Sequence, residues 1–154
     1  MKTKSIFHSF LKKKPTPSRL VMTLLTRDSA DVLRENIDFH LSQGVDFIIA
    51  MDNLSTDGTK EILESYQERG VLHYIYQPST EFNQAKWVTQ MARMAKKRFG
   101  ATWVINNDCD EFWWPTDTSK NLKTIFSELD ASVKVAVCSR KNFIYPIELS
   151  LIHI

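Results

Sequence analysis

Residues 102–115, TWVINNDCDEFWWP, pass from an apolar segment directly into a cluster of acids, aromatic residues and a proline. Residues 102–106 have the composition of a strand buried in a parallel sheet. In an extended chain the side chains alternate between faces, so Asp108 and Asp110 point the same way. Such a pair of like charges usually needs a cation. Mg²⁺ or Mn²⁺ suits these oxygen ligands, with substrate phosphates completing the coordination shell.

A solvated acidic turn is the alternative interpretation of Asp-x-Asp, and for the bare motif it is the commoner one. The position of the pair favours a site, because open α/β sheets bind ligands at the carboxyl ends of their strands. The aromatic residues Phe112, Trp113 and Trp114 could stack on a sugar ring or belong to the core. Adjacent indoles cannot face the same way, so we expect one in the core and one lining the site.

Strand-like and helix-like segments alternate on both sides of this stretch. The apolar runs predict strands at residues 20–25, 45–51, 71–76, 102–106 and 133–138. The 3.6-residue periodicity predicts helices at residues 31–43, from a cap at Ser55 or Thr56 to Gly70, at 83–99 and at 122–129. This order predicts an α/β fold with three layers, α/β/α, around a mostly parallel sheet.

The charge of the chain is unevenly distributed. Residues 1–19 carry six Lys or Arg and no acid; because the whole chain carries +2, residues 20–154 carry −4. This predicts a basic disordered tail at 1–19 and one domain at 20–148. Residues 12–14 could touch anionic lipid at the inner face of the membrane, and a solvated tail is the more common alternative.

The two cysteines are too few for a disulfide framework, so we expect reduced thiols. No run approaches the ~18 apolar residues of a membrane span, and no signal peptide is apparent. These features predict a cytoplasmic protein. The last residues, 149–154 (LSLIHI), resemble a translated sequencing adapter. We therefore expect a non-native end there and a domain that is incomplete at its C-terminus.

A second polar loop, residues 52–59 (DNLSTDGT), follows the second predicted strand. Its spacing resembles an EF-hand calcium loop, but an EF-hand requires a preceding helix, and a strand is predicted here. The loop is better interpreted as part of the ligand-binding edge of the sheet. Helix capping explains Ser55, Thr56 and Asp57, whereas Asp52 is free to accept hydrogen bonds from a base or ribose.

Four segments in this order resemble the family-2-like glycosyltransferases of bacterial cell-surface polysaccharide synthesis, in particular a subgroup with an Asp-x-Asp-Glu-Phe motif. They are residues 21–46, 52–63, 86–95 and 103–115. The resemblance implies a GT-A fold that binds a nucleoside diphosphate sugar and Mn²⁺ or Mg²⁺. It also implies a glycan or lipid-linked acceptor, and no nucleic-acid partner is expected.

The resemblance also implies roles for individual residues. Asp108 and Asp110 would bind the metal, Asp108 would also approach the ribose or sugar, and Glu111 would assist Asp110 in catalysis. The nucleotide and sugar would contact Thr26, Arg27, Asp28, Asp52, Asp57, Lys86, Trp87, Arg93 and Trp113. For Arg27, Lys86 and Arg93 an ordinary exposed surface position is about as common. A general base for the acceptor would come from chain beyond the acidic motif.

Three other functions compete with sugar transfer. A nucleotidyltransferase or a dinucleotide-dependent dehydrogenase would need glycines after the first strand, and residues 23–31, TLLTRDSAD, contain none. An inactive nucleotide-binding fragment or scaffold is the stronger alternative, because the acceptor site and the base are expected elsewhere.

Overall fold

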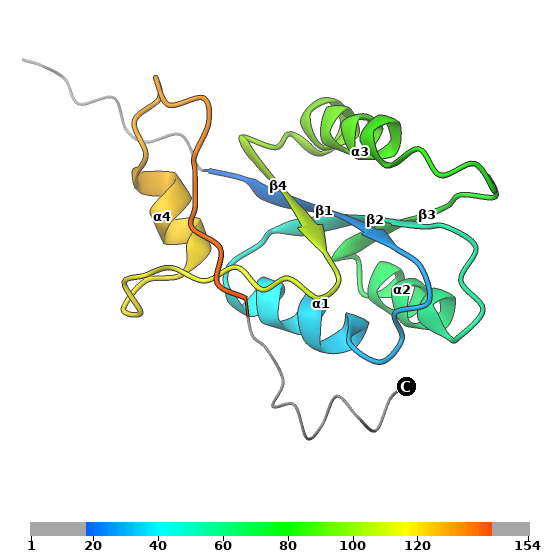
Figure 1. Ribbon diagram of the computed structural model, residues 1–154. Coiled ribbons are helices and arrows are strands. Elements are labelled where there is room, and N and C mark those ends of the chain that lie inside the picture. Colours follow the sequence, from blue (N-terminus) through cyan, green and yellow to red (C-terminus); the bar gives the residue numbers. More distant parts are fainter. Residues whose placement is uncertain (1–17, 143–154) are drawn as a thin grey trace, which may run out of the picture.

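A computed structural model describes residues 18–142 of the chain. Four parallel strands form one sheet in the order β3-β2-β1-β4, and helices connect them (Figure 1). The elements are β1 Leu20–Thr26, α1 Leu33–Ser42, β2 Phe47–Asp52, α2 Thr59–Glu68, β3 Leu72–Tyr76, α3 Gln84–Phe99, β4 Trp103–Asp108 and α4 Leu122–Glu128. The predicted α/β fold with a mostly parallel sheet is confirmed.

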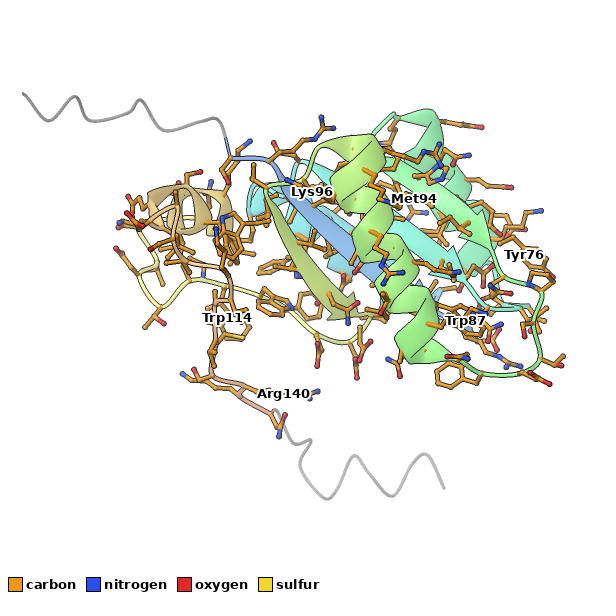
Figure 2. The ribbon with its side chains drawn as sticks, turned by 90° about the horizontal axis from the view of Figure 1, so that it is seen from above. Tyr76, Trp87, Met94, Lys96, Trp114 and Arg140 are labelled. Carbon is orange, nitrogen blue, oxygen red and sulfur yellow. The ribbon has the colours of Figure 1, made fainter. Side chains whose placement is uncertain are left out.

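The sheet is covered on both faces, which gives the three predicted layers. Helix α3 lies alone on one face, and α1 and α2 lie on the other (Figure 1). Figure 2 shows α3 crossing its face, with Trp87 toward its first turn and Lys96 toward its last. Alternate residues of each strand face opposite sides of a sheet, so the strands supply two separate cores.

The larger core lies between the sheet and α1 and α2, and α4 adds Leu122 and Phe126 to it. The smaller core lies under α3, which buries Trp87, Met91 and Ala95 at four-residue intervals. This spacing keeps one stripe of the helix on the sheet. Gly100 then ends α3 in a left-handed conformation with φ of 65°.

Two predictions about these elements are wrong. No strand forms at residues 133–138, where Val135 and Val137 are 76% and 94% exposed. Their alternation imitates a strand, but no neighbouring strand pairs with this segment in the described part of the chain. Helix α2 begins at Thr59 with Gly58 as its N-cap, because the loop uses Ser55 and Thr56 for other hydrogen bonds.

Two other predictions concern residues that the structure does not describe. Only Ser18 and Arg19 of the predicted basic tail at 1–19 are described, and the predicted non-native end at 149–154 lies wholly outside the described residues. Within residues 18–142, no helix has the length and apolar character needed to span a membrane.

Candidate donor-binding site

The acidic motif lies where the strand order changes direction. The chain builds β1, β2 and β3 outward and then returns to place β4 on the other side of β1. Leu25 pairs with Asp108 and Thr26 pairs with Asp52, so the three strands end side by side. Such a switch point leaves a crevice at the carboxyl ends of the strands.

A cavity of about 470 Å³ opens at this edge. It is built from the ends of β1 and β4, the loops that follow β1 and β2, and the start of α3. Its lining includes Thr26, Arg27, Asp28, Asp31, Asn53, Phe82, Gln84, Asp108 and Asp110. We call this space the acid cavity. The structure therefore brings together the expected acidic pair and the expected loop after β1.

The acid cavity holds more negative than positive charge. Four carboxylates line it, and Arg27 is its single basic residue. Arg27 lies 3.7 Å from Asp28, so its charge is shared with that residue. Asp108 and Asp110 take part in none of the side-chain hydrogen bonds or ion pairs found among residues 18–142. Both carboxylates are therefore available to an external cation.

Two carboxylates suit Mg²⁺ or Mn²⁺, which take the rest of their ligands from water and substrate phosphates. Over the described range, no group of three or more His, Cys, Asp or Glu side chains is placed to hold a metal by itself. Such an ion would therefore depend on the bound substrate for part of its coordination. The hydroxyl of Thr26 also lines the cavity and is buried without a hydrogen-bond partner among residues 18–142.

Helix α1 holds the acidic loop in place. The side-chain amide of Asn36 donates to the carbonyl oxygens of Cys109 and Glu111, at 2.8 Å and 2.7 Å. Its oxygen accepts from the amide of Asn107 at 3.0 Å. Because Asn36 is fully buried, these bonds fix the backbone on both sides of Asp110.

His40, one turn further along α1, supports the same loop. Its Nδ1 lies 2.7 Å from the carbonyl oxygen of Asn36, and its Nε2 accepts from the backbone N–H of Trp113 at 3.2 Å. This pattern requires the neutral imidazole with its proton on Nδ1. Burial lowers the pKa of His40, and its hydrogen bond to Asn36 opposes that shift only in part. His40 therefore has a structural role in this loop.

The loops after β1 and β2 are tied together by their acids. The Asp28 carboxylate accepts from the backbone N–H of Thr56 at 2.7 Å, and Asp57 accepts from that of Ala30 at 2.9 Å. Ser55 completes the link by accepting from the N–H of Asp28. The N–H of Ala30 is also the main cause of the lowered pKa of Asp57. Asp28 adopts φ of 47° within this linkage.

Asp52 does not line the cavity. It is 1% exposed, and its carboxylate accepts from the N–H of Ser55 at 3.0 Å and the hydroxyl of Tyr74 at 3.3 Å. Burial, reinforced by the Asp52 charge, raises the pKa of Tyr74 to about 12. A contact between Asp52 and a base stays a prediction, and the limiting feature is the burial of the carboxylate. Asn53, the next residue, does reach the cavity.

The three residues expected from α3 are dispersed. Trp87 is buried under the helix, Lys86 is exposed, and Arg93 lines a separate groove two turns along. At the start of α3, Gln84 and the preceding Phe82 line the acid cavity instead. Phe82 is 68% exposed and packs edge-on against Trp87, with ring centroids 5.7 Å apart.

A family model described as glycosyltransferase family 92 matches residues 22–148. The chain belongs to glycosyltransferase family 92. No curated protein matches it significantly. Among solved structures, it is similar to the crystal structure of S. aureus TarS 1-349, at 19% identity and a TM-score of 0.48. That similarity covers 61% of this chain and 28% of the TarS chain, so this chain spans little more than a quarter of it.

The match confirms the prediction that the chain belongs to a glycosyltransferase family. The motifs resembled family-2-like enzymes, whereas the family found is family 92. The GT-A subgroup and the roles given to individual residues stay predictions.

The remaining acidic and aromatic residues of this family 92 chain lie beyond the cavity lining. Glu111 pairs with Arg140 at 2.7 Å. Trp113 packs against the larger core, whereas Trp114 is 46% exposed. The two indoles therefore differ in burial, as expected, but neither lines the acid cavity. A contact between Trp113 and the substrate stays a prediction.

The residues that position the site were not among those predicted from the sequence. Asn36 and His40 lie in the buried stripe of α1 together with Leu33 and Ile37. Polar residues on the apolar face of a helix need buried partners, and this signal could have identified both. Asn53, Phe82 and Gln84 gave no comparable signal, because they belong to loops or to a helix start.

Proposed function

We propose that the acid cavity binds a nucleoside diphosphate sugar together with Mn²⁺ or Mg²⁺, and that the whole protein transfers the sugar to a glycan or lipid-linked acceptor. Family 92 membership supports the transfer chemistry. One observation carries the donor site: Asp108 and Asp110 line the same cavity at the switch point of the sheet and bind no described side chain.

Different residues of the cavity would contact different parts of the nucleotide sugar. Asp108 and Asp110 would hold the divalent ion, which when bound offsets the negative charge on the leaving diphosphate. Gln84 lies at the N-terminus of α3, whose unpaired backbone N–H groups favour phosphate. Arg27 adds a positive charge at the rim. Asp28, Asn53 and the free hydroxyl of Thr26 offer polar contacts to the ribose or the base.

Asp110 and Glu111 are our candidates for catalysis. Asn36 fixes the backbone that carries both residues. Glu111 adjoins Asp110 in the chain and pairs with Arg140 outside the cavity lining, so it would support Asp110 without lining the cavity itself. A role in cell-surface polysaccharide synthesis and a cytoplasmic location, peripheral to the membrane, complete the proposal.

Calorimetry with nucleoside diphosphates tests the donor site. We expect binding that requires Mn²⁺ and falls at least about tenfold in Asp110→Asn, because one charged ligand of the ion is lost. Asp117→Asn is the matched control: Asp117 is exposed, lies outside the cavity and should leave binding unchanged. Equal affinity with and without metal would refute the proposed site.

A second measurement separates an enzyme from a binding fragment or scaffold. Hydrolysis or transfer of the sugar by a chain that binds the nucleotide supports the enzyme. Metal-dependent binding without any turnover, in the presence of candidate glycan acceptors, supports the fragment.

A further inference from the structure

Helix α3 carries a row of basic side chains along its outer face. Lys86, Arg93 and Lys97 are separated by seven and four residues, which places them on one side of the helix. They lie opposite the stripe that is buried against the sheet, and all three are exposed. Lys96 is exposed beside them, and α3 contains no Asp or Glu. Together these four residues form a strongly positive ridge.

The charges of this ridge are not neutralised within the described residues. Ion pairs between residues 18 and 142 involve six basic residues, and none of these lies on α3. The helices on the opposite face have the reverse balance. Together α1 and α2 contain five acids and two basic residues. The two outer layers of the domain thus carry opposite charge.

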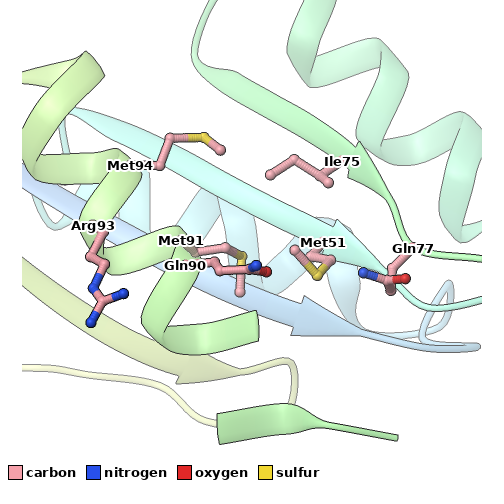
Figure 3. A pocket seen from close by; sticks show the side chains of 7 residues that line it. All are labelled: Met51, Ile75, Gln77, Gln90, Met91, Arg93 and Met94. Carbon is pink, nitrogen blue, oxygen red and sulfur yellow. The ribbon is translucent and has the colours of Figure 1, made fainter. Parts of the chain in front are cut away.

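An apolar groove lies along the same helix. It has a volume of about 430 Å³ and runs between α3 and the ends of β2 and β3 (Figure 3). Its apolar lining consists of Met51, Ile75, Met91 and Met94, and Arg93 and Gln90 stand at its α3 side. No aromatic side chain lines it. Met51 and Met91 are buried, and Ile75 and Met94 are half-buried, so the face combines basic groups with a small, partly accessible apolar patch.

The basic segment of the sequence joins the domain close to the end of this helix. Residues 1–19 carry six positive charges and no acid. The backbone N–H of Arg19 donates to the Thr102 hydroxyl at 2.7 Å, and Thr102 lies three residues after the end of α3. Arg19, the last residue of this basic segment, therefore lies beside the residues that follow α3.

We propose that the outer face of α3 is a docking surface for an anionic phospholipid bilayer. Basic side chains at a membrane surface attract anionic head groups, and apolar side chains beside them enter the interface. A single-stranded nucleic acid would be expected to stack on exposed aromatic residues, which this groove lacks. The groove shares no lining residue with the acid cavity. The proposal rests on the peripheral membrane location given under the proposed function and assigns a surface to it; vesicle binding and metal-dependent nucleotide binding are measured separately, so either can fail alone.

Sedimentation of the full chain with vesicles tests this surface. Wild type should bind vesicles made of equal parts phosphatidylcholine and phosphatidylglycerol, and should not bind phosphatidylcholine alone. Added salt should weaken the binding. Replacing three basic residues of the ridge, as in Arg93→Gln/Lys96→Gln/Lys97→Gln, should weaken it about tenfold to a hundredfold.

A matched control carries the same net charge. Arg34→Gln/Lys60→Gln/Lys134→Gln neutralises three exposed basic residues outside α3 and should bind nearly as wild type does. Thermal melts confirm that both variants fold. Equal losses in the two variants would overturn the proposal, as would losses seen only in Lys12→Gln/Lys13→Gln/Lys14→Gln. Absence of vesicle binding by wild type, with single-stranded RNA bound through the same three α3 residues, would also overturn it.

Discussion

Replacing Asn36 with Ala should damage both the stability of the domain and its binding of nucleotide. The substitution removes two donors and one acceptor from a fully buried position. A buried hydrogen bond contributes about 1 kcal/mol net, so three lost bonds predict a decrease of about 3 kcal/mol in unfolding free energy. The carbonyl oxygens of Cys109 and Glu111 would be left unpaired, and the backbone around Asp110 would no longer be fixed.

The assay compares Asn36→Ala with a variant of similar stability loss. Leu63→Ala removes a fully buried side chain of α2 and should also cost about 3 kcal/mol. Denaturant titration gives the unfolding free energies, and calorimetry with Mn²⁺ and a nucleoside diphosphate is then run where both variants are folded. We expect affinity to fall at least about tenfold in Asn36→Ala and to be unchanged in Leu63→Ala. Equal affinities in the two variants would refute the positioning role of Asn36.

Three further predictions follow from other parts of the domain. Gly44→Ala should lower the unfolding free energy more than Gly70→Ala in denaturant titrations. Both glycines have positive φ, but an added Cβ at Gly44 would lie 2.7 Å from the Cβ of Lys123, whereas an added Cβ at Gly70 would have no neighbouring atom within 4 Å. Equal losses would mean that Lys123 moves aside. His40 has a lowered pKa and is neutral in the fold, so unfolding free energy should decrease as pH falls from about 7 to about 5. His40→Gln should reduce this dependence of the unfolding free energy on pH. An unchanged pH dependence in the variant would contradict the neutral, low-pKa state of His40. A thiol reagent should modify exposed Cys138 quickly and Cys109 only on unfolding, because Cys109 is buried and burial raises its pKa; equal rates in the native protein would be inconsistent with this burial.

Most of the fold could be predicted from the sequence because its strands are short apolar runs and its helices carry clear stripes. Three helices end within two residues of Gly44, Gly70 and Gly100, close to the ends predicted from the sequence. The strand expected at 133–138 failed because alternation shows which residues could share a face, not whether a neighbouring strand exists to pair with them. Pairing is a property of the assembled sheet.

The acidic pair could be predicted because it follows directly from strand β4 and the rule that ligands bind at strand ends. The roles of Asp52 and Ser55 could not be predicted, because each depends on a hydrogen-bond partner that is distant in the sequence. Ser55 accepts a hydrogen bond from Asp28, and Asp52 accepts one from Tyr74. Local propensity describes a cap for α2, whereas the tertiary structure assigns Ser55 to a neighbouring loop.

The mutual exchange of hydrogen bonds between the loops after β1 and β2 has a consequence for mutagenesis. Asp28 holds the backbone at Thr56, and Asp57 holds the backbone at Ala30. Substituting either acid alone should release both loops, and substituting the second should then add little. Single alanine substitutions at residues 28 and 57 would therefore each report the same loss of stability. Only a double-mutant cycle across the two residues would show that both losses come from one shared connection between the loops.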